Sequence, residues 1–421
     1  MSRSLKVRPD RIEEIKFAVK RNGFPRQQDL AEDLKISLAT LSSYLNGRPV
    51  DYCNFVDISE RLGQDWQTLA DLSDNGIARK ESTLAIAPDL HPFIYIKRPA
   101  IEENAYEELR RSGALVRVKA PQLMGKTSLL IRLMERVRKQ GDRVAYINLN
   151  LAKKDDLEDI DCFFKWFCIV TGQALGLENR IKDYWDEEFS TSKVDCTDYF
   201  EKYLLSQNDF PLILCLDEVE RIFPYQGVAQ EFLGLLRAWH EQAKVRPIWG
   251  KIRLVLAHST EVYVPLNINE SPFNVGLSVE LPEFNEAQIL ELTRLHELNW
   301  TEQEVRQLMA IVGGHPYLVE RALSQLKGDK NKTLEELLDS AVLDSGIYGN
   351  HLRHLWNAIA PKEELLKALK AVCFAFHPVR LDSFSSFQLD SLGVILIQKD
   401  GAIVRCNLYR QYFSDRLGER Q

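Results

Sequence analysis

Four apolar runs alternate with helix-like segments in the middle of this chain, and no other feature of the sequence limits the fold as strongly. The runs are ALVRVKA (114–120), RVAYINLNL (143–151), PLILCLD (211–217) and IRLVLAH (252–258). Strands that are apolar almost throughout and are separated by helices are typical of a parallel sheet buried on both faces. The pattern therefore predicts a three-layer α/β core.

The segment APQLMGKTSLL (120–130), which begins where the first apolar run ends, indicates a phosphate-binding loop. The pattern of such a loop is G-x-x-x-x-G-K-Ser/Thr, and a turn from strand to helix points free backbone N–H groups at phosphate oxygens. Gly125 would let the backbone approach a phosphate, and Lys126 would reach the β- and γ-phosphates. Thr127 would bind Mg²⁺ through its hydroxyl.

The loop departs from this pattern at its first position, where Ala120 replaces glycine. That glycine mainly serves the backbone geometry of the loop entrance, so alanine is compatible with binding if its φ angle is negative. Pro121 stiffens the entrance, and we include Pro121 and Ser128 among the nucleotide-binding residues. The substitution favours a slow switch over a fast motor.

Two acids, Asp217 and Glu218, follow the third apolar run in PLILCLDEVE. They lie at the C-terminal edge of the predicted sheet, where ligands of such folds bind. Asp217 would hold Mg²⁺, and Glu218 would orient or deprotonate the attacking water, so we assign Lys126 and Glu218 as catalytic. The fourth run leads into Ser259, which would lie beside the γ-phosphate or would simply be a polar strand end.

With these motifs in place, the chain resembles the AAA-like ATPases with a degenerate first glycine, which are similar to the STAND class of signalling NTPases. The resemblance covers roughly residues 93–413 and rests on YIKRPAIEE (95–103), APQLMGKTSL, LILCLDEVE, LVLAHSTEVY and GGHPYLVERAL (313–323). It implies a P-loop ATPase core, a helical lid and a winged-helix-like domain that clamps the nucleotide in a resting state.

The same resemblance implies further nucleotide contacts. GGHPYL resembles the Gly-x-Pro motif of the lid, so His315 or Pro316 would approach the nucleotide; the alternative is an ordinary turn at the start of a helix. Arg98, within YIKRP, would lie near the base, although an arginine before a proline is commonly a surface residue.

The organisation we expect is a helix-turn-helix domain (1–77), a linker (78–92), the ATPase core (93–282), a helical lid (283–330) and a winged-helix-like domain (331–421). Charges, small residues and two prolines without a clear period mark the linker. In the last domain, the pair Asp400-Gly401 between GVILIQKD and GAIVRCNL predicts a β-hairpin.

The N-terminal domain is predicted to be all-α, because PRQQDLAEDLKISLATLSSYLNGRPV (25–50) contains two short helical patterns joined by LKIS. Ser37 is expected to cap the second helix, whose apolar face would consist of Leu38, Leu41 and Leu45. The segment resembles the helix-turn-helix of phage repressors, in which the second helix enters the major groove of DNA. The candidate DNA contacts are Thr40, Ser43, Tyr44, Asn46 and Arg48.

Charge leaves the role of this N-terminal domain open. Residues 1–28 carry eight Lys/Arg against three Asp/Glu, which favours DNA binding. The acidic neighbours disfavour it, because DNA affinity depends largely on the release of counterions from phosphates; they are Glu32, Asp33, Asp51 and Asp57. Double-stranded DNA is therefore one candidate partner, and a docked protein is the alternative.

Composition sets outer limits on the function. A net charge of −7 and a pI near 5.8 exclude a chain that coats nucleic acid over its whole surface. Seven cysteines without a Cys-x-x-Cys pair suit reduced thiols. Because neither a secretory pattern nor an apolar run of about 20 residues is present, we expect a cytoplasmic protein with no membrane partner.

Together the motifs predict a molecular switch that binds ATP or ADP with Mg²⁺, hydrolyses ATP slowly and couples its nucleotide state to DNA-linked regulation. We expect a homo-oligomer in the ATP state. One alternative is a STAND-type signalling or defence scaffold that oligomerises with ATP and recruits protein partners. Another is an ATPase that loads onto DNA, as transposition-type AAA ATPases do.

Overall fold

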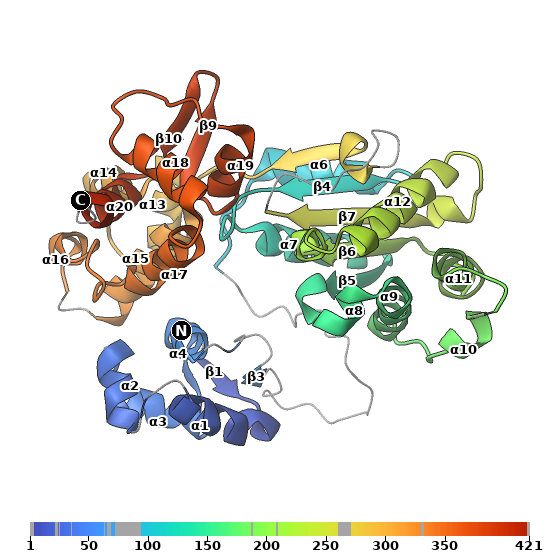
Figure 1. Cartoon of the computed structure of the whole chain (residues 1–421), viewed down its shortest axis with the longest axis horizontal. Helices are drawn as coiled ribbons and strands as arrows, with labels where there is room; N and C mark the ends of the chain where they lie inside the picture. The colour runs from blue at the N-terminus through green and yellow to red at the C-terminus, as the bar shows by residue number, and fades with distance from the viewer. Residues whose placement is uncertain are drawn as a thin grey trace. The chain divides into compact units, whose positions relative to one another are not determined.

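The computed structural model divides into a small unit, residues 1–81 with 343–353, and a large unit, residues 82–342 with 354–421 (Figure 1). The structure describes residues 4–21, 24, 26–34, 36–62, 64, 69–71, 94–186, 188–207, 209–259, 271–329 and 332–418. The linker predicted at 78–92 lies outside these residues. The other domain boundaries stay predictions.

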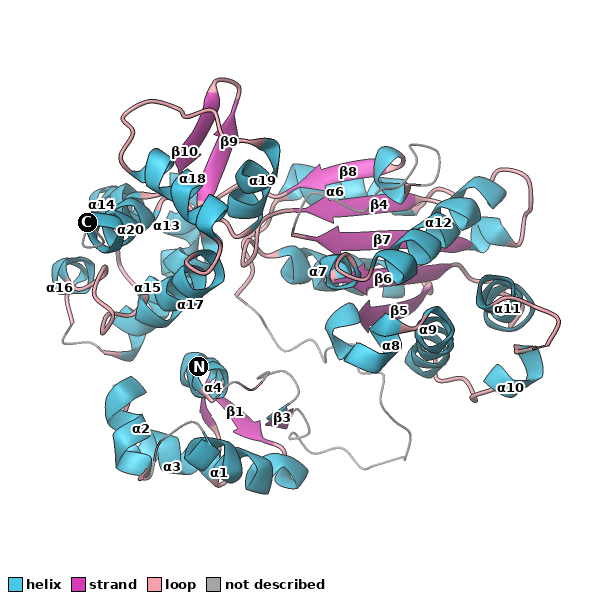
Figure 2. Cartoon of the chain, in the orientation of Figure 1, coloured by secondary structure: helices cyan, strands magenta, loops and turns pink. Residues whose placement is uncertain are grey.

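A five-stranded parallel sheet forms the centre of the large unit, in the order β5-β6-β7-β4-β8 (Figure 2). The strands are β4 (Leu115–Lys119), β5 (Arg143–Asn148), β6 (Leu212–Asp217), β7 (Ile252–His258) and β8 (Leu277–Glu280). The first four coincide with the four predicted apolar runs. The α/β core with a parallel sheet is therefore confirmed.

The fifth strand, β8, was not predicted, because its sequence contains no apolar run. It has four residues, of which Val279 is buried, and it lies at the edge of the sheet beside β4. The residue before it is Gly276, with a φ angle of 70°, and a Cβ atom there would lie 2.1 Å from the carbonyl oxygen of Leu115. A glycine is therefore needed for β8 to approach β4.

Helices cover both faces of the sheet, as the apolar strands require. Along β6, Ile213 and Cys215 pack with helices α6 (Pro99–Leu109) and α7 (Lys126–Arg138). Successive strand side chains point to opposite faces, so Leu214 packs on the other side. That second face is covered by elements between β5 and β7, namely α8 (Lys154–Glu158), α9 (Ile160–Ala174), α11 (Ser192–Asp198), the π-helix Tyr199–Leu204 and α12 (Gln226–Gln242).

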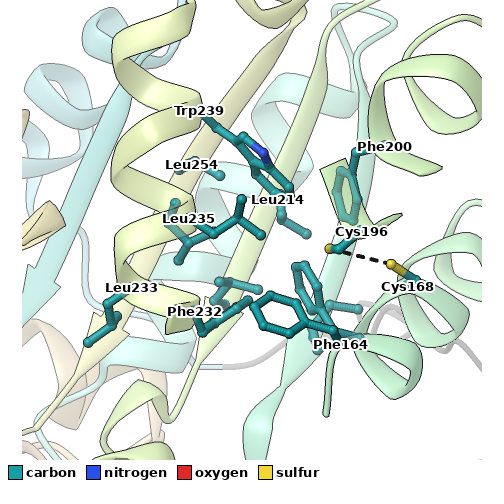
Figure 3. Close-up of a cluster of buried hydrophobic side chains, with 14 of the residues drawn as sticks. Phe164, Cys168, Cys196, Phe200, Leu214, Phe232, Leu233, Leu235, Trp239 and Leu254 are labelled. Atoms are coloured by element: carbon teal, nitrogen blue, oxygen red, sulfur yellow. Dashed lines mark hydrogen bonds between the residues drawn. The ribbon is translucent and has the colours of Figure 1, made fainter. Parts of the chain in front are cut away.

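Aromatic rings fix α9 to α12 in this second layer (Figure 3). The ring centroid of Phe232, from α12, lies 5.0 Å from that of Phe163 and 4.8 Å from that of Phe167, both from α9. Beside them the sulfur atoms of Cys168 and Cys196 are 3.5 Å apart. Burial raises the pKa of the Cys168 thiol, so it behaves as a packing group.

The rest of the large unit is mainly helical. Helices α13 (Glu286–Leu295), α14 (Glu302–Val312) and α15 (Pro316–Gly328) follow the sheet, and α10 (Ile181–Tyr184) precedes α11. The C-terminal region contains α16 (Leu334–Asp339), α17 (Gly349–Ile359), α18 (Glu363–Cys373), α19 (Ser383–Ser391), β9 (Ile395–Gln398), β10 (Gly401–Val404) and α20 (Asn407–Gly418). Strands β9 and β10 form the predicted antiparallel hairpin. The winged-helix-like assignment stays a prediction.

The small unit is not all-α, which corrects the prediction. Its helices α1 (Ile12–Arg21), α2 (Gln27–Leu34), α3 (Leu38–Leu45) and α4 (Tyr52–Arg61) accompany a three-stranded antiparallel sheet. The central strand β1 (Ser4–Val7) pairs with β2 (Val50–Asp51) and β3 (Ala70–Asp71). Strands of two to four residues are too short to give a periodic signal in the sequence.

Helices α2 and α3 agree closely with the predicted helix pair. The hydroxyl oxygen of Ser37 accepts a hydrogen bond from the backbone N–H of Thr40 at 3.0 Å, as expected of an N-cap. Leu41 and Leu45 are buried, whereas Leu38 is 48% exposed. Leu38 is the first residue of α3, so the packed face of this helix begins one turn later than predicted.

No helix in the described part of the chain is both long enough and apolar enough to cross a membrane.

Removal of the Phe232 ring tests the packing of α12 on α9. Phe232→Ala is expected to lower the free energy of unfolding by about 3–5 kcal/mol, because it leaves a cavity among aromatic rings. Urea unfolding followed by tryptophan fluorescence measures this loss. The control is Phe189→Ala, because Phe189 is 83% exposed; equal unfolding curves for the two variants would contradict the packing.

Candidate active site

The predicted phosphate loop connects β4 to α7, at the C-terminal edge of the sheet. The positive φ angles in this loop belong to Leu123 and Gly125, at 62° and 93°, and Ala120 is not among the residues with positive φ. Ala120 is buried, and its N–H donates to the carbonyl of His258 at 3.4 Å. The alanine therefore fits the loop entrance without backbone strain.

Lys126, the first residue of α7, is 5% exposed and folds back over the loop. Its ammonium group donates to the carbonyl oxygens of Ala120 and Pro121, both at 3.1 Å. The positive charge therefore lies inside the loop that was predicted to bind phosphate.

Asp217 connects three elements of the site. Its carboxylate has no exposed surface and accepts hydrogen bonds from the Thr127 hydroxyl at 2.8 Å and the Tyr146 hydroxyl at 2.9 Å. The backbone N–H of Glu218 donates to its other oxygen at 3.0 Å. Sequence reasoning missed Tyr146, which occupies an ordinary strand position in β5; its place beside Asp217 follows from the pairing of β5 with β6.

The donor set at Thr127 and Asp217 fits Mg²⁺. This ion prefers hard oxygen ligands, and it usually takes one or two from the protein and the rest from phosphate and water. A hydroxyl and a carboxylate 2.8 Å apart at the end of the phosphate loop supply the protein's share.

Glu218 has a left-handed backbone conformation, with φ 57° and ψ 42°, between β6 and the 3₁₀ helix Val219–Ile222. A non-glycine residue in this region stores strain, and such strain often occurs at functional sites. Burial, together with the negative charge of Asp217, raises the pKa of the Glu218 carboxyl, and the positive charge of Lys126 opposes this. A raised pKa brings a carboxylate nearer to the range of an effective general base.

Glu220 is a third acid that sequence reasoning missed. Burial and the charge of Glu218 raise its pKa to about 7, although Lys126 opposes the shift. Its carboxylate accepts the backbone N–H of Ser259 at 3.0 Å, and Ser259 itself is 2% exposed. The motif DEVE could have predicted a role for Glu220, because this acid lies only three residues after Asp217.

Arg98 lies beneath the phosphate loop and is only 5% exposed. Its guanidinium donates to the carbonyl oxygens of Met124 at 3.4 Å and Pro282 at 3.5 Å, and it lies 4.8 Å from the centroid of the Phe284 ring. Burial lowers the pKa of Arg98. The surface alternative for this arginine is therefore wrong.

The C-terminal region contacts the phosphate loop directly. The backbone N–H of Gln122 donates to the carbonyl oxygen of Ser391, at the end of α19, at 3.2 Å. A Cβ atom on Gly393 would lie 3.5 Å from Pro121 Cβ and 3.8 Å from the Nε2 atom of His315. His315 is 1% exposed and precedes Pro316 at the start of α15. His315, one of the two predicted lid residues, therefore lies close to the loop.

A buried arginine holds this contact in place. The Arg405 guanidinium donates to the carboxylates of Glu283 at 3.1 Å and Asp390 at 3.4 Å, and its side chain is 4% exposed. The other oxygen of Glu283 accepts the N–H of Gly314 at 3.0 Å. We call Arg405, Glu283 and Asp390 the clasp, because they join α19 and β10 to the segments that flank α13 and α14.

The candidate DNA contacts lie on α3 and just after it. Thr40 and Ser43 are half-buried, and Asn46 and Arg48 are exposed. Tyr44 has no exposed surface, and its hydroxyl is hydrogen-bonded to Ser59 at 2.7 Å. Tyr44 is therefore a core residue, and its assignment as a DNA contact was wrong. The sequence placed Tyr44 at the edge of the buried face of α3, whereas the structure places it within that face.

A parallel sheet with a phosphate loop after β4, and with acids after β6, which β7 separates from β4, defines a P-loop protein of the ATPase type. Residues 85–415 match the AAA-like domain family. The chain belongs to this family. Among curated proteins, no sequence matches it.

The chain is similar to several solved structures. A Walker-type ATPase of Pyrococcus abyssi superposes with a TM-score of 0.53 at 14% identity, over 76% of this chain and 96% of the other. Cdc6p of Pyrobaculum aerophilum gives 0.44 at 15% identity, over 78% and 97%. The ORC2 protein of Aeropyrum pernix, in its ADPNP–ADP complexes, gives 0.39 at 13% identity, over 78% and 96%. At 14% identity, the likeness to the Pyrococcus abyssi ATPase concerns the fold alone.

Proposed function

We propose that this protein is a nucleotide-controlled switch that binds ATP with Mg²⁺ and hydrolyses it slowly. The observation that carries the proposal is the hydrogen bond between the N–H of Gln122, in the phosphate loop, and the carbonyl of Ser391, in the C-terminal region. A backbone N–H of this loop is a natural donor to a phosphate oxygen. Phosphate and the C-terminal region therefore compete for the same donor.

The phosphates are held by the residues of the loop. Gly125 and the first turn of α7, which includes Ser128, offer backbone N–H groups, and Lys126 swings from the carbonyls of the loop to the phosphates. Pro121 keeps the loop entrance rigid. Arg98, whose guanidinium donates to the carbonyl oxygen of Met124, contributes positive charge close to the loop.

Thr127 and Asp217 would hold Mg²⁺, which when bound would neutralise charge on the phosphate oxygens. Glu218 faces the attacking water as general base or orienting group, because its raised pKa and fixed backbone suit that role. Ser259 lies at the end of β7 on the γ-phosphate side. His315 and Pro316 approach the nucleotide from the lid.

Lys126→Ala tests nucleotide binding. The loss of one charged hydrogen-bond donor, worth about 1.5–3 kcal/mol, is expected to weaken ADP and ATP binding about 10- to 150-fold. Titration with a fluorescent ADP analogue measures this, together with the nucleotide content of the purified protein. Lys139→Ala, an exposed lysine at the other end of α7, is the control. If both variants bind as tightly as the wild type, the proposed site is wrong.

The clasp gives the switch its stability. Arg405 is almost fully buried between two carboxylates, and a buried charge that loses its partner is costly. As long as the clasp is intact, Ser391 stays on the phosphate loop. A γ-phosphate that accepts the N–H of Gln122 displaces the carbonyl of Ser391, which the clasp holds in place. The nucleotide state is therefore coupled to the position of the C-terminal region.

Weakening of the clasp is expected to speed nucleotide exchange. Arg405→Met and the milder Asp390→Asn should both release a fluorescent ADP analogue faster than the wild type, because the contact on the loop opens more often. Stopped-flow displacement by unlabelled ADP measures the rate. Arg132→Met, at an exposed pair with Glu135, is the control. If circular dichroism shows that both clasp variants are folded and both release the analogue at the wild-type rate, the coupling between the clasp and nucleotide exchange is ruled out.

We propose that the output of the switch is binding of double-stranded DNA through the small unit. The support is the helix pair α2–α3, the cap at Ser37, and the exposed side chains of Asn46 and Arg48 at the end of α3. Thr40 and Ser43 lie on the same helix. The local excess of Lys/Arg in residues 1–28 adds a favourable field.

Arg48→Ala in the full chain tests this output. It is expected to weaken binding to a random-sequence duplex at low salt and to reduce the slope of log K against log salt by about one, because one phosphate contact is lost. Fluorescence anisotropy measures both. Lys367→Ala, an exposed lysine of the large unit, is the control. If the wild type binds no duplex but assembles with ATP in light scattering, the scaffold function replaces DNA regulation.

A further inference from the structure

Glu220 has a contact that none of the roles proposed so far explains. One oxygen of its carboxylate accepts the N–H of Ser259 at 3.0 Å. Its other oxygen, and the hydroxyl of Ser259, are both buried and have no hydrogen-bond partner within the described residues. Two unsatisfied polar groups in a pair of contacting residues are costly to a fold, because each group has lost its hydration.

The contact between Glu220 and Ser259 lies next to the proposed nucleotide site. Glu220 belongs to the 3₁₀ helix Val219–Ile222, which directly follows Asp217 and Glu218. Ser259 follows β7, whose last residue, His258, accepts the N–H of Ala120 in the phosphate loop. A single chain of contacts therefore runs from the acids of β6, through Glu220, to the end of β7 and the loop.

The ionised carboxylate of Glu220 does not stabilise the fold. Burial and the nearby charge of Glu218 both act against its ionised form, and Lys126 offsets them only in part. A neutral acceptor such as glutamine would make the same bond to Ser259 at a lower cost. Stability alone therefore does not explain this buried side chain, and its acceptor oxygen on the Ser259 N–H points to a role at the site.

We propose that Glu220 is a positioning residue for ATP hydrolysis, which holds Ser259 in place beside the γ-phosphate and fixes the turn that carries Glu218. The proposal rests on the proposed ATPase function. Its core is the acceptor oxygen: when Glu220 accepts the Ser259 N–H, the end of β7 cannot move away from the acids of β6.

The experiment compares Glu220→Ala with Glu220→Gln in the full chain. The alanine variant loses the acceptor and is expected to lower kcat about 10- to 100-fold, as small misplacements do, with KM for ATP little changed. The glutamine variant keeps an acceptor oxygen and is expected to retain most of kcat. Glu231→Ala, an exposed glutamate on α12, is the control, and thermal melting verifies that each variant is folded.

A second measurement does not need turnover. Because Ser259 faces the γ-phosphate, Glu220→Ala should reduce the preference for a non-hydrolysable ATP analogue over ADP, and Glu220→Gln should keep it. If wild-type protein binds neither nucleotide, the proposed function fails and this inference fails with it. If wild-type protein turns over ATP or prefers the analogue, and Glu220→Ala matches it, this inference alone is overturned. Equal damage in both variants would also overturn it, because positioning requires only the acceptor.

Discussion

The carboxylate of Asp217 is the interaction on which the site depends. It has no exposed surface, and it accepts hydrogen bonds from the hydroxyls of Thr127 and Tyr146 and from the N–H of Glu218. These donors come from α7, β5 and the turn after β6. A buried charge is tolerated only when its hydrogen bonds are satisfied, so the same groups that stabilise Asp217 also fix the phosphate loop against the acids.

The C-terminal region adds a second constraint. In the phosphate loop, the N–H of Gln122 is bound to the carbonyl oxygen of Ser391. Arg405 holds that contact through Glu283 and Asp390. Because Arg405 is buried, the loss of either carboxylate would destabilise the folded chain. Phosphate could bind this N–H only if the Ser391 contact opened, and this competition is the physical basis of the proposed switch.

Prediction from the sequence succeeded where local patterns carry the information. Four of the five strands, the cap at Ser37 and the C-terminal hairpin all have signals within about ten residues. The segment around Lys126 and the pair Asp217 and Glu218 lie together at the predicted edge of the sheet, and their role in nucleotide binding stays a prediction. Prediction failed at β8 and β1, whose strands are too short to give a period, and at Tyr44, where a polar hydroxyl concealed a core residue. Arg98 was assigned to the nucleotide by resemblance; its burial excludes the surface alternative, and its contact with the nucleotide stays a prediction.

The sequence by itself determined the class of fold and the chemistry of the loop, because both follow from which residue types are adjacent along the chain. Only the tertiary structure decided what those residues contact. Tyr146 and Glu220 meet partners 71 and 39 residues away in the sequence, and in the clasp Glu283 and Arg405 are separated by 122 residues. Contacts between such distant segments leave no local pattern, because packing and not sequence spacing brings them together.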